Sequence, residues 1–212
     1  MNVVSRVQRG LESLYRIDTG VAIDDFVIDA AVRARLCDGR KPREQLLVCE
    51  DDGELLLALF LDERSLANLA RHDPGRTLDD RNLGDFLLAV EGVSHFIYAI
   101  RCAQAARPVT QLELELQAEV DKYVTCLLAI AAERPVSEAI RRRLFVDCGY
   151  DDDLDGDERA RYRAANDNAH RYASWLEHTF VAPRRIPEML AELRAFYRHG
   201  LAGKLAVIAA AA

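Results

Sequence analysis

Two long apolar-patterned stretches, joined through Pro108, constrain the fold of this chain more than any other feature. The first, over residues 85–104, places these apolar side chains at helical spacing: Phe86, Val90, Val93, Ile97 and Ile100. The second, over residues 109–133, does so with a longer series: Leu112, Leu116, Val120, Tyr123, Leu127 and Ile130. The first stretch is apolar nearly all round, which is typical of a central helix. Because a short connection favours antiparallel neighbours, we expect the two helices to pair at the centre of the fold.

Shorter helical patterns fill most of the remaining chain. One covers residues 4–18, and a second is predicted from a cap at Asp24 to Leu36, where a polar run breaks it. Further helices are predicted over residues 64–71, 135–148, 158–180 and 187–200, followed by an Ala-rich tail over 201–212. Neither an internal repeat nor a linker rich in Gly, Ser or Pro interrupts this order. We therefore expect residues 1–212 to form a single α-helical domain.

One β-hairpin is predicted within this helical chain, over residues 45–61. Two strand-length runs, 45–50 and 54–61, flank Asp51-Asp52-Gly53, and an Asp-Gly pair supplies the positive φ that a tight hairpin turn needs. The second run is apolar on both faces, so helices or a partner must cover it. The predicted fold class is thus mainly α, a multi-helix, bundle-like single domain with one β-hairpin.

Composition excludes several classes of protein. Half of the 212 residues are hydrophobic and 30% are charged, which excludes collagen-like and intrinsically disordered chains. The formal net charge of −7 argues against a nucleic-acid partner, because phosphate backbones attract basic surfaces. The opening residues carry Arg6, Arg9 and Arg16, so we expect no signal peptide, and the longest uncharged run, 205–212, is too short for a membrane span.

The cysteines and the amino-acid composition indicate the cellular compartment and the kind of organism. The five cysteines are odd in number and form no C-x-x-C pair, which predicts reduced, mostly buried thiols rather than disulfides or a zinc site. Abundant Ala, Arg, Leu and Asp with few Lys is typical of a bacterial protein from a GC-rich genome. We expect a cytoplasmic protein.

The sharpest candidate for chemistry is Glu91 with His95. Four residues separate them on a predicted helix, so they are vertical neighbours, and Tyr98 continues the same face. On a central helix the carboxylate favours a protonated imidazole while burial opposes it, which suits a general base with an orienting acid. The candidate catalytic residues are therefore Glu91, His95 and Tyr98. The alternative is an ordinary ion pair on a helix edge.

Three other patterns are weaker pointers to a ligand. Carboxylates at Glu113 and Glu119 on the facing helix could join His95 in a metal site, although they fall on opposite flanks of the apolar stripe. Residues 151–156 match the opening of a calcium loop, but Tyr162 occupies the twelfth position, where a Glu is required. The acidic run is otherwise typical of a helix N-terminus. We expect no cofactor, and the sequence leaves a metal open.

The remaining motifs indicate a binding protein more than an enzyme. The basic clusters 141–143 and 184–185 lie in helix-forming sequence without an aromatic platform, which favours solvated faces or pairing with the acidic run 151–158. The sequence contains no nucleotide cradle, nucleophile elbow or HExxH motif. We therefore expect a non-enzymatic regulatory protein that acts through protein–protein contacts, as a homodimer or with another protein. The alternative is a small helical enzyme or ligand- or metal-binding protein with its site around Glu91 and His95.

Overall fold

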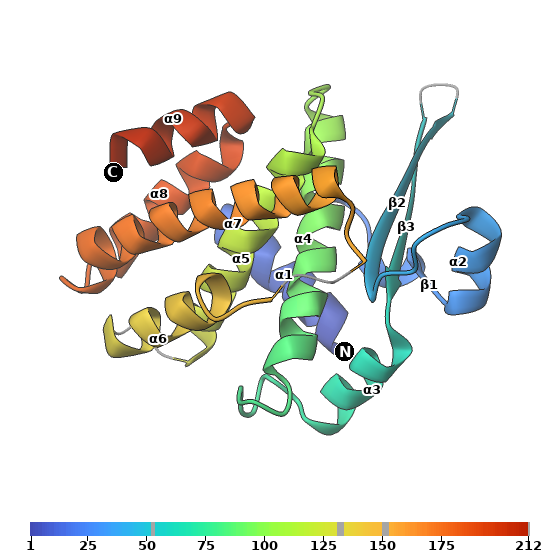
Figure 1. Cartoon of the computed structure of the whole chain (residues 1–212), viewed down its shortest axis with the longest axis horizontal. Helices are drawn as coiled ribbons and strands as arrows, with labels where there is room; N and C mark the ends of the chain where they lie inside the picture. Colours follow the sequence, from blue (N-terminus) through green and yellow to red (C-terminus); the bar gives the residue numbers. More distant parts are fainter. Residues whose placement is uncertain (52–53, 131–133, 150–152, 212) are drawn as a thin grey trace. The chain divides into compact units, whose positions relative to one another are not determined.

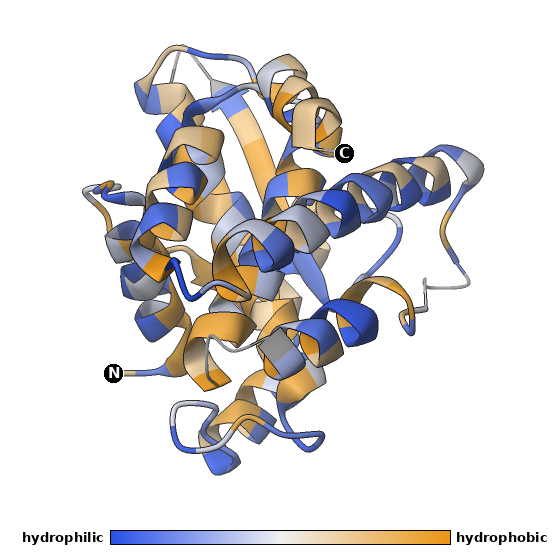
Figure 2. Ribbon diagram, turned by 90° about the vertical axis from the view of Figure 1, so that its left-hand side faces the viewer, coloured by the Kyte–Doolittle hydropathy of each residue, from blue (hydrophilic) through white to orange (hydrophobic). Residues whose placement is uncertain are grey.

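The structure, a computed structural model, describes residues 1–51, 54–130, 134–149 and 153–211. Its packing divides the chain into two compact units. The first unit comprises Met1–Ser13 and Ile17–Arg107, and the second comprises Leu14–Arg16 and Pro108–Ala212. The fold is mainly helical with a small sheet, which confirms the predicted class (Figure 1). Figure 2 shows helices that carry hydrophilic and hydrophobic residues side by side, as expected of helices that bury one face.

The first unit contains the sheet and its covering helices. Its elements are α1 (Val3–Tyr15, whose last two residues group with the second unit), η1 (Ile23–Asp25), β1 (Val27–Ile28), α2 (Ala30–Leu36), β2 (Glu44–Asp51), β3 (Glu54–Leu61), α3 (Glu63–Arg71) and α4 (Leu83–Gln104). The helix predicted from Asp24 to Leu36 is wrong in its first half. A 3-10 turn and a short strand occupy that half, and Asp29 caps α2 by accepting from the Val32 amide at 2.7 Å.

The sheet has three strands in the order β1-β3-β2, so it is mixed and not a hairpin alone. β2 and β3 pair antiparallel from Glu44↔Leu61 to Asp51↔Glu54, which confirms the predicted hairpin strands. The predicted turn residues Asp52 and Gly53 lie outside the described residues. β1 adds parallel to β3, with Val27 opposite Leu59. The sequence missed β1 because a two-residue strand has no periodicity, yet it occupies backbone groups along the second edge of β3.

Helix α4 covers one face of this sheet. It packs on β2 and β3, and most of its residues from Phe86 to Cys102 are buried. By length and composition α4 could also cross a membrane, but 61% of its most apolar window is buried inside the protein. Such burial is typical of the core helix of a soluble protein.

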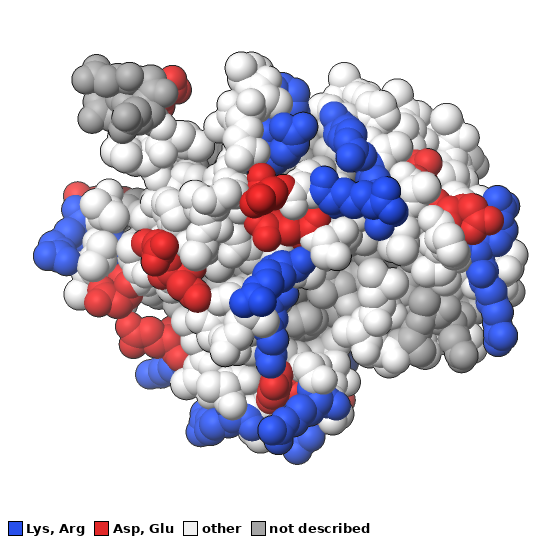
Figure 3. All heavy atoms as spheres, turned by 180° about the vertical axis from the view of Figure 1, so that it is seen from behind, with Lys and Arg blue, Asp and Glu red and all other residues white. Residues whose placement is uncertain are grey.

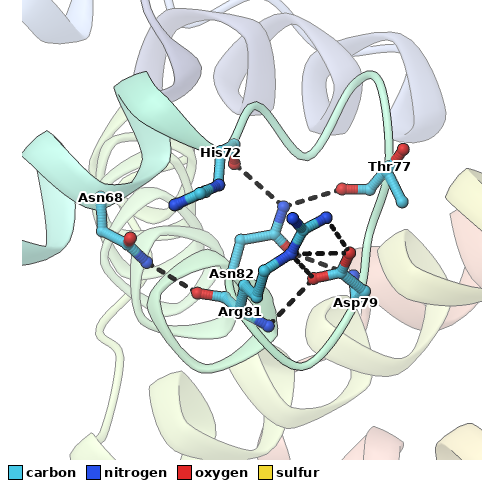
Figure 4. A network of polar contacts seen from close by, with 6 residues as sticks. All are labelled: Asn68, His72, Thr77, Asp79, Arg81 and Asn82. Carbon is cyan, nitrogen blue, oxygen red and sulfur yellow. Dashed lines mark hydrogen bonds and ion pairs between the residues drawn. The ribbon is translucent and has the colours of Figure 1, made fainter.

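The loop between α3 and α4 is ordered by a network of side-chain contacts with its backbone (Figure 4). The Asn82 amide donates to the carbonyl oxygens of His72 at 2.9 Å and Thr77 at 2.7 Å, and its own oxygen accepts from the Asp79 amide at 3.0 Å. Arg81 forms an ion pair with Asp79, at 2.6 Å between Nη2 and Oδ2. The network holds the chain in a defined entry to α4, which positions that helix on the sheet.

The second unit is helical throughout its described residues. Its elements are α5 (Gln111–Ile130), α6 (Arg134–Phe145), α7 (Gly156–Leu176), the π-helical turn η2 (Glu177–Val181), α8 (Ile186–Arg198) and α9 (Leu201–Ala211). Helix α5 packs mainly on α7. Helix α4 belongs to the sheet unit and α5 to the helical unit, so the expected central α4–α5 pair stays a prediction. The apolar stripe of each helix predicted burial, but it did not identify the neighbour.

A polar network lies in the core of the second unit. Lys204 on α9 is fully buried and donates to the side-chain oxygen of Gln117. The Gln117 amide donates to Asp121 at 2.8 Å, and the Tyr15 hydroxyl donates to the same carboxylate oxygen. The ammonium group also lies 4.6 Å from the Phe196 ring centroid. These contacts satisfy opposite charges that would otherwise be costly to bury.

All five cysteines are free, as predicted, but only two are buried. Cys102 and Cys126 are buried, Cys37 is partly exposed, and Cys49 and Cys148 are exposed. The expectation of mostly buried thiols was therefore wrong, because Cys49 lies on the outer half of β2 and Cys148 follows the end of α6.

Candidate functional site

The predicted site residues lie on α4, and a second carboxylate joins them from the sheet. His95 is 7% exposed, and its Nδ1 lies 3.4 Å from Oε1 of Glu44 on β2. Glu91 is partly exposed one turn before His95. Glu44 could not be found from helical spacing, because it lies 51 positions earlier in the chain. The structure therefore places His95 between helix and strand, with the Glu44 carboxylate near it and Glu91 one helical turn away.

Gly92 explains how α4 comes so close to Glu44. A Cβ atom at this position would lie 2.9 Å from Cδ2 of Leu61, 3.0 Å from Cγ of Glu44 and 3.1 Å from Cδ1 of Leu59. These distances are shorter than ordinary carbon contacts, so a larger residue at position 92 would force these side chains to shift. A glycine inside a long apolar helix was the sequence signal for such close packing.

Tyr98 is nearly fully buried, and its hydroxyl contacts the segment that follows α4. Arg107 Nη2 donates to the Tyr98 hydroxyl at 3.1 Å and to Cys102 Sγ at 2.9 Å. The guanidinium lies 5.7 Å from the Tyr98 ring centroid. Tyr98 and Cys102 thus anchor the end of the first unit.

Two cavities have linings that do not include Glu91, His95 or Tyr98. One, of about 540 Å³ in the first unit, has a largely apolar lining from α1 and α3. An ion pair between Arg6 and Asp73 lies at its rim. The other, of about 450 Å³ in the second unit, is lined by residues of α6, α7, η2 and α9.

The carboxylates considered for a metal have other partners. Glu119 accepts from Lys122 on the same helix at 2.6 Å, and Glu113 is buried on α5. Over the residues that the structure describes, no group of three or more His, Cys, Asp and Glu side chains is arranged to hold a metal ion.

The acidic run before α7 contains a helix cap. Asp155 accepts from the Glu158 amide at 2.7 Å, and the Glu158 carboxylate accepts from the Asp155 amide at 3.2 Å. This reciprocal pair is a capping box, as favoured for an acidic helix start. The first predicted calcium ligand, Asp151, lies outside the described residues.

The basic clusters are paired with acids where their contacts are described. Arg142 pairs with Asp147 at 3.0 Å, and Arg185 pairs with Glu188 at 3.3 Å. On the face shown in Figure 3, basic and acidic side chains are interspersed, so no broad patch of one sign forms there. The acids in these pairs, Asp147 and Glu188, lie outside the acidic run 151–158 that was the expected partner.

The outer half of the β2–β3 hairpin is the most exposed apolar feature of the first unit. At the base, α4 packs on the face that carries Glu44, Leu59 and Leu61, and Arg33 of α2 lies 3.7 Å from the Phe60 ring centroid on the other face. Towards the tip, Val48 is 54% exposed on the α4 face, and Leu56 is 51% exposed on the α2 face. The hairpin therefore needs cover on two faces.

The free edge of this hairpin is β2. Among the described strands, β3 is the sole partner of β2, so the outer edge of β2 offers unpaired backbone groups. The chain entering β2 carries Arg40, Lys41 and Arg43, of which Arg43 pairs with Asp85 at 2.5 Å, whereas Glu50 lies near the far end of the strand. We call this strand, with its charged ends and exposed apolar residues, the β2 edge.

Comparison of the chain with family models, with curated proteins and with solved structures gives no match. The geometry of the molecule is therefore the basis for a functional proposal.

Proposed function

We propose that this chain is a non-enzymatic, cytoplasmic binding protein whose partner is a second copy of itself, joined along the β2 edge. The observation that carries the proposal is the outer half of the hairpin, which combines an open strand edge with large apolar side chains exposed on both faces. Natural monomers protect such edges with lysine, proline or a bulge. The run Leu46-Leu47-Val48-Cys49 contains none of these residues.

Charge favours a second copy as the occupant. Two identical strands that pair antiparallel bring the start of one against the end of the other. Lys41, which precedes β2, would then lie towards Glu50 at the far end of the strand in the second copy. Opposite charges across neighbouring strands stabilise a pair, whereas like charges oppose it. A parallel arrangement would place like charges together.

The arrangement of helices also suits antiparallel pairing. The base of each hairpin is covered on one face by α4 and on the other by α2. Antiparallel pairing lays the uncovered tip of one hairpin beside the covered base of the other. Val48 and Leu56 would then lie next to the helices of the second copy and lose exposed apolar surface.

The direct test is the mass in solution, measured by size-exclusion chromatography with light scattering. We expect a concentration-dependent dimer, and we expect Val48→Lys to be monomeric because a lysine at the edge opposes strand addition. Val146→Lys is the matched control, since Val146 is 56% exposed in the second unit against 54% for Val48. A monomer at every concentration, or equal effects of both variants, would contradict the proposal.

A charge exchange separates a second copy from any other partner. Glu50→Lys should weaken the dimer, because it places a lysine opposite the basic start of the second copy. Adding Lys41→Glu to the same chain restores an opposite pair and should restore the dimer. Failure of the double variant to recover would count against antiparallel self-pairing.

A second candidate function rests on the pairing of His95 with Glu44. A buried imidazole near two carboxylates can hold or move a proton, so a small helical enzyme or ligand-binding protein with a site at Glu91, His95 and Tyr98 is the alternative. Elemental analysis and a thermal-shift screen with metals and metabolites would test it. The alternative requires a ligand whose stabilisation is lost in His95→Gln, and a screen without any such ligand would contradict it.

A further inference from the structure

The cavity of about 450 Å³ in the second unit combines cationic, imidazole and aromatic side chains. Its lining comprises Arg141, His170, Arg171, Ser174, Trp175, His178 and Ala211. A volume of this size lies within the usual range for small-molecule sites. Every lining residue belongs to the second unit, so the cavity is separate from the hairpin and its proposed role.

Helix α7 supplies most of the polar groups from a single face. Arg171, Ser174, Trp175 and His178 follow at intervals of three or four residues, which places them on one side of a helix. Arg171 is exposed and has no ion pair among the described residues. The positive charge of Arg171 is therefore available to a ligand.

Arg141 faces the cavity from α6 and is held from behind. Its Nε lies 3.5 Å from Oε2 of Glu177, and its Nη1 donates to Nε2 of His170 at 2.8 Å. The His170 ring stacks on Phe145, with 5.6 Å between the ring centroids. Two partners and a stacked ring thus fix the guanidinium before any ligand arrives, which lowers the entropic cost of binding.

The π-helical turn Glu177–Val181 supplies the carboxylate that holds Arg141, and it contributes His178 to the cavity lining. Glu177 is 2% exposed and accepts from Ser137 at 2.8 Å as well as from Arg141. The next residue, His178, is exposed, and its Nδ1 donates to the Ser174 carbonyl oxygen at 2.8 Å. The other ring nitrogen, Nε2, is not used in this hydrogen bond. Single π-helical turns occur frequently at functional sites because they re-aim side chains that a regular helix would misplace.

We propose that this cavity binds a small organic anion, with a carboxylate or phosphate group at Arg141 and Arg171 and a planar body against Trp175. The buried Glu177 carboxylate offsets one guanidinium charge, so the other remains to balance an anionic ligand. His170 accepts a hydrogen bond from Arg141 and is therefore a neutral part of the wall. Burial and the Arg141 charge lower the pKa of His170, in agreement with this role.

The size of the cavity argues for an organic ligand over a bare ion. A free phosphate would contact the guanidinium groups but leave the aromatic side of the cavity unfilled. Trp175 and Ala211 provide apolar lining for the remainder of a ligand. Aromatic acids and aromatic phosphates share the required chemistry.

The fluorescence of Trp175 gives a direct test, because the sequence contains one tryptophan. The full chain would be titrated with phenyl phosphate, benzoate, inorganic phosphate and, as a neutral probe, benzyl alcohol. We expect a saturable change with phenyl phosphate, benzoate or both, and much weaker binding of inorganic phosphate and benzyl alcohol. The stronger of the two aromatic anions identifies the head group.

The matched variants are Arg171→Gln and Arg163→Gln, which remove the same charge from exposed positions of α7 inside and outside the cavity. Arg171→Gln should weaken binding about tenfold, the effect of losing one charge-assisted hydrogen bond, and Arg163→Gln should leave it unchanged. Circular dichroism would verify that both variants fold. The proposal is overturned if no aromatic anion saturates the signal, if benzyl alcohol binds equally well, or if the two variants behave alike.

Discussion

The two units of this protein differ in where the groups with shifted pKa values lie. In the sheet unit, hydrogen bonds lower the pKa of exposed or partly exposed aspartates: Ser5 and Asn2 act on Asp24, Arg6 acts on Asp73, and Arg81 brings the pKa of Asp79 to about 2. In the helical unit, burial raises the pKa of Tyr123 to about 12 and of Cys126 to about 12. The first unit therefore favours ionised acids at its surface, and the second favours neutral groups in its core.

This difference predicts whether low or high pH lowers the stability of each unit. A carboxylate whose folded pKa is lowered stabilises the fold above its unfolded value, and the stabilisation is lost as the pH falls through the folded pKa. A phenol or thiol whose folded pKa is raised stabilises the fold below its unfolded value, and this is lost as the pH rises towards the folded pKa. Acid should therefore weaken the first unit, and alkali the second.

The largest predicted effect is the loss of the second unit in alkali. Tyr123 and Cys126 have ordinary pKa values of 10.0 and 9.0, so the destabilising window opens above about pH 9 and extends towards pH 12. Trp175 reports on this unit alone, and far-ultraviolet circular dichroism reports on both. In alkali the tryptophan emission should shift together with the first loss of helix. In acid, the dichroism should change before the tryptophan emission does. Tryptophan emission that shifts first in acid, or last in alkali, would contradict the comparison.

The next largest effect should come from the buried polar network of the second unit. Asp121→Asn removes the charge that the Lys204–Gln117 chain and Tyr15 converge on, and we expect a loss of about 3 kcal/mol in the free energy of unfolding. Urea unfolding would measure it. Asp167→Asn, at an exposed position of α7, is the control and should change stability by less than about 0.5 kcal/mol. Similar values for both variants would mean that the network contributes little.

A smaller effect is expected at the packed interface of the first unit. Gly92→Ala forces a Cβ against Leu61 and Leu59 and should cost about 2 kcal/mol through overpacking. Gly84→Ala, on the same helix with nothing within 4 Å, should be neutral or stabilising, because alanine favours helix more than glycine does. Thermal unfolding of the two variants sharpens the comparison, and equal melting temperatures would contradict the close approach of α4 to the sheet.

The sequence predicted those parts of the fold that depend on local pattern. The repeat of apolar residues identified α4 and α5, and the Asp-Gly pair located the hairpin strands. The neighbours of these elements could not be predicted, because an apolar stripe does not specify what covers it. The prediction for residues 23–36 failed for a local reason. The helical spacing of the apolar residues is weak there, and both Asp24 and Asp29 are suitable helix caps.

The candidate sites show the same limit. Glu91 and His95 were found because they are four residues apart, whereas Glu44 reaches His95 only through the packing of α4 on β2. The cavity on α7 was missed, although the basic cluster 141–143, which contains Arg141, was considered as a possible binding surface. The spacing of Arg171, Ser174, Trp175 and His178 was a signal in the sequence, but a π-helical turn leaves none, so the contact of Glu177 with Arg141 could not be predicted.

The central claim, that the β2 edge pairs with a second copy, is tested most directly by hydrogen–deuterium exchange at increasing protein concentration. The amides of Glu44–Asp51 that do not face β3 should become protected as concentration rises, while those of α7 stay unchanged. The same amides should remain unprotected in Val48→Lys. Exchange in β2 that is independent of concentration, in a protein that light scattering finds dimeric, would place the interface elsewhere and contradict the account.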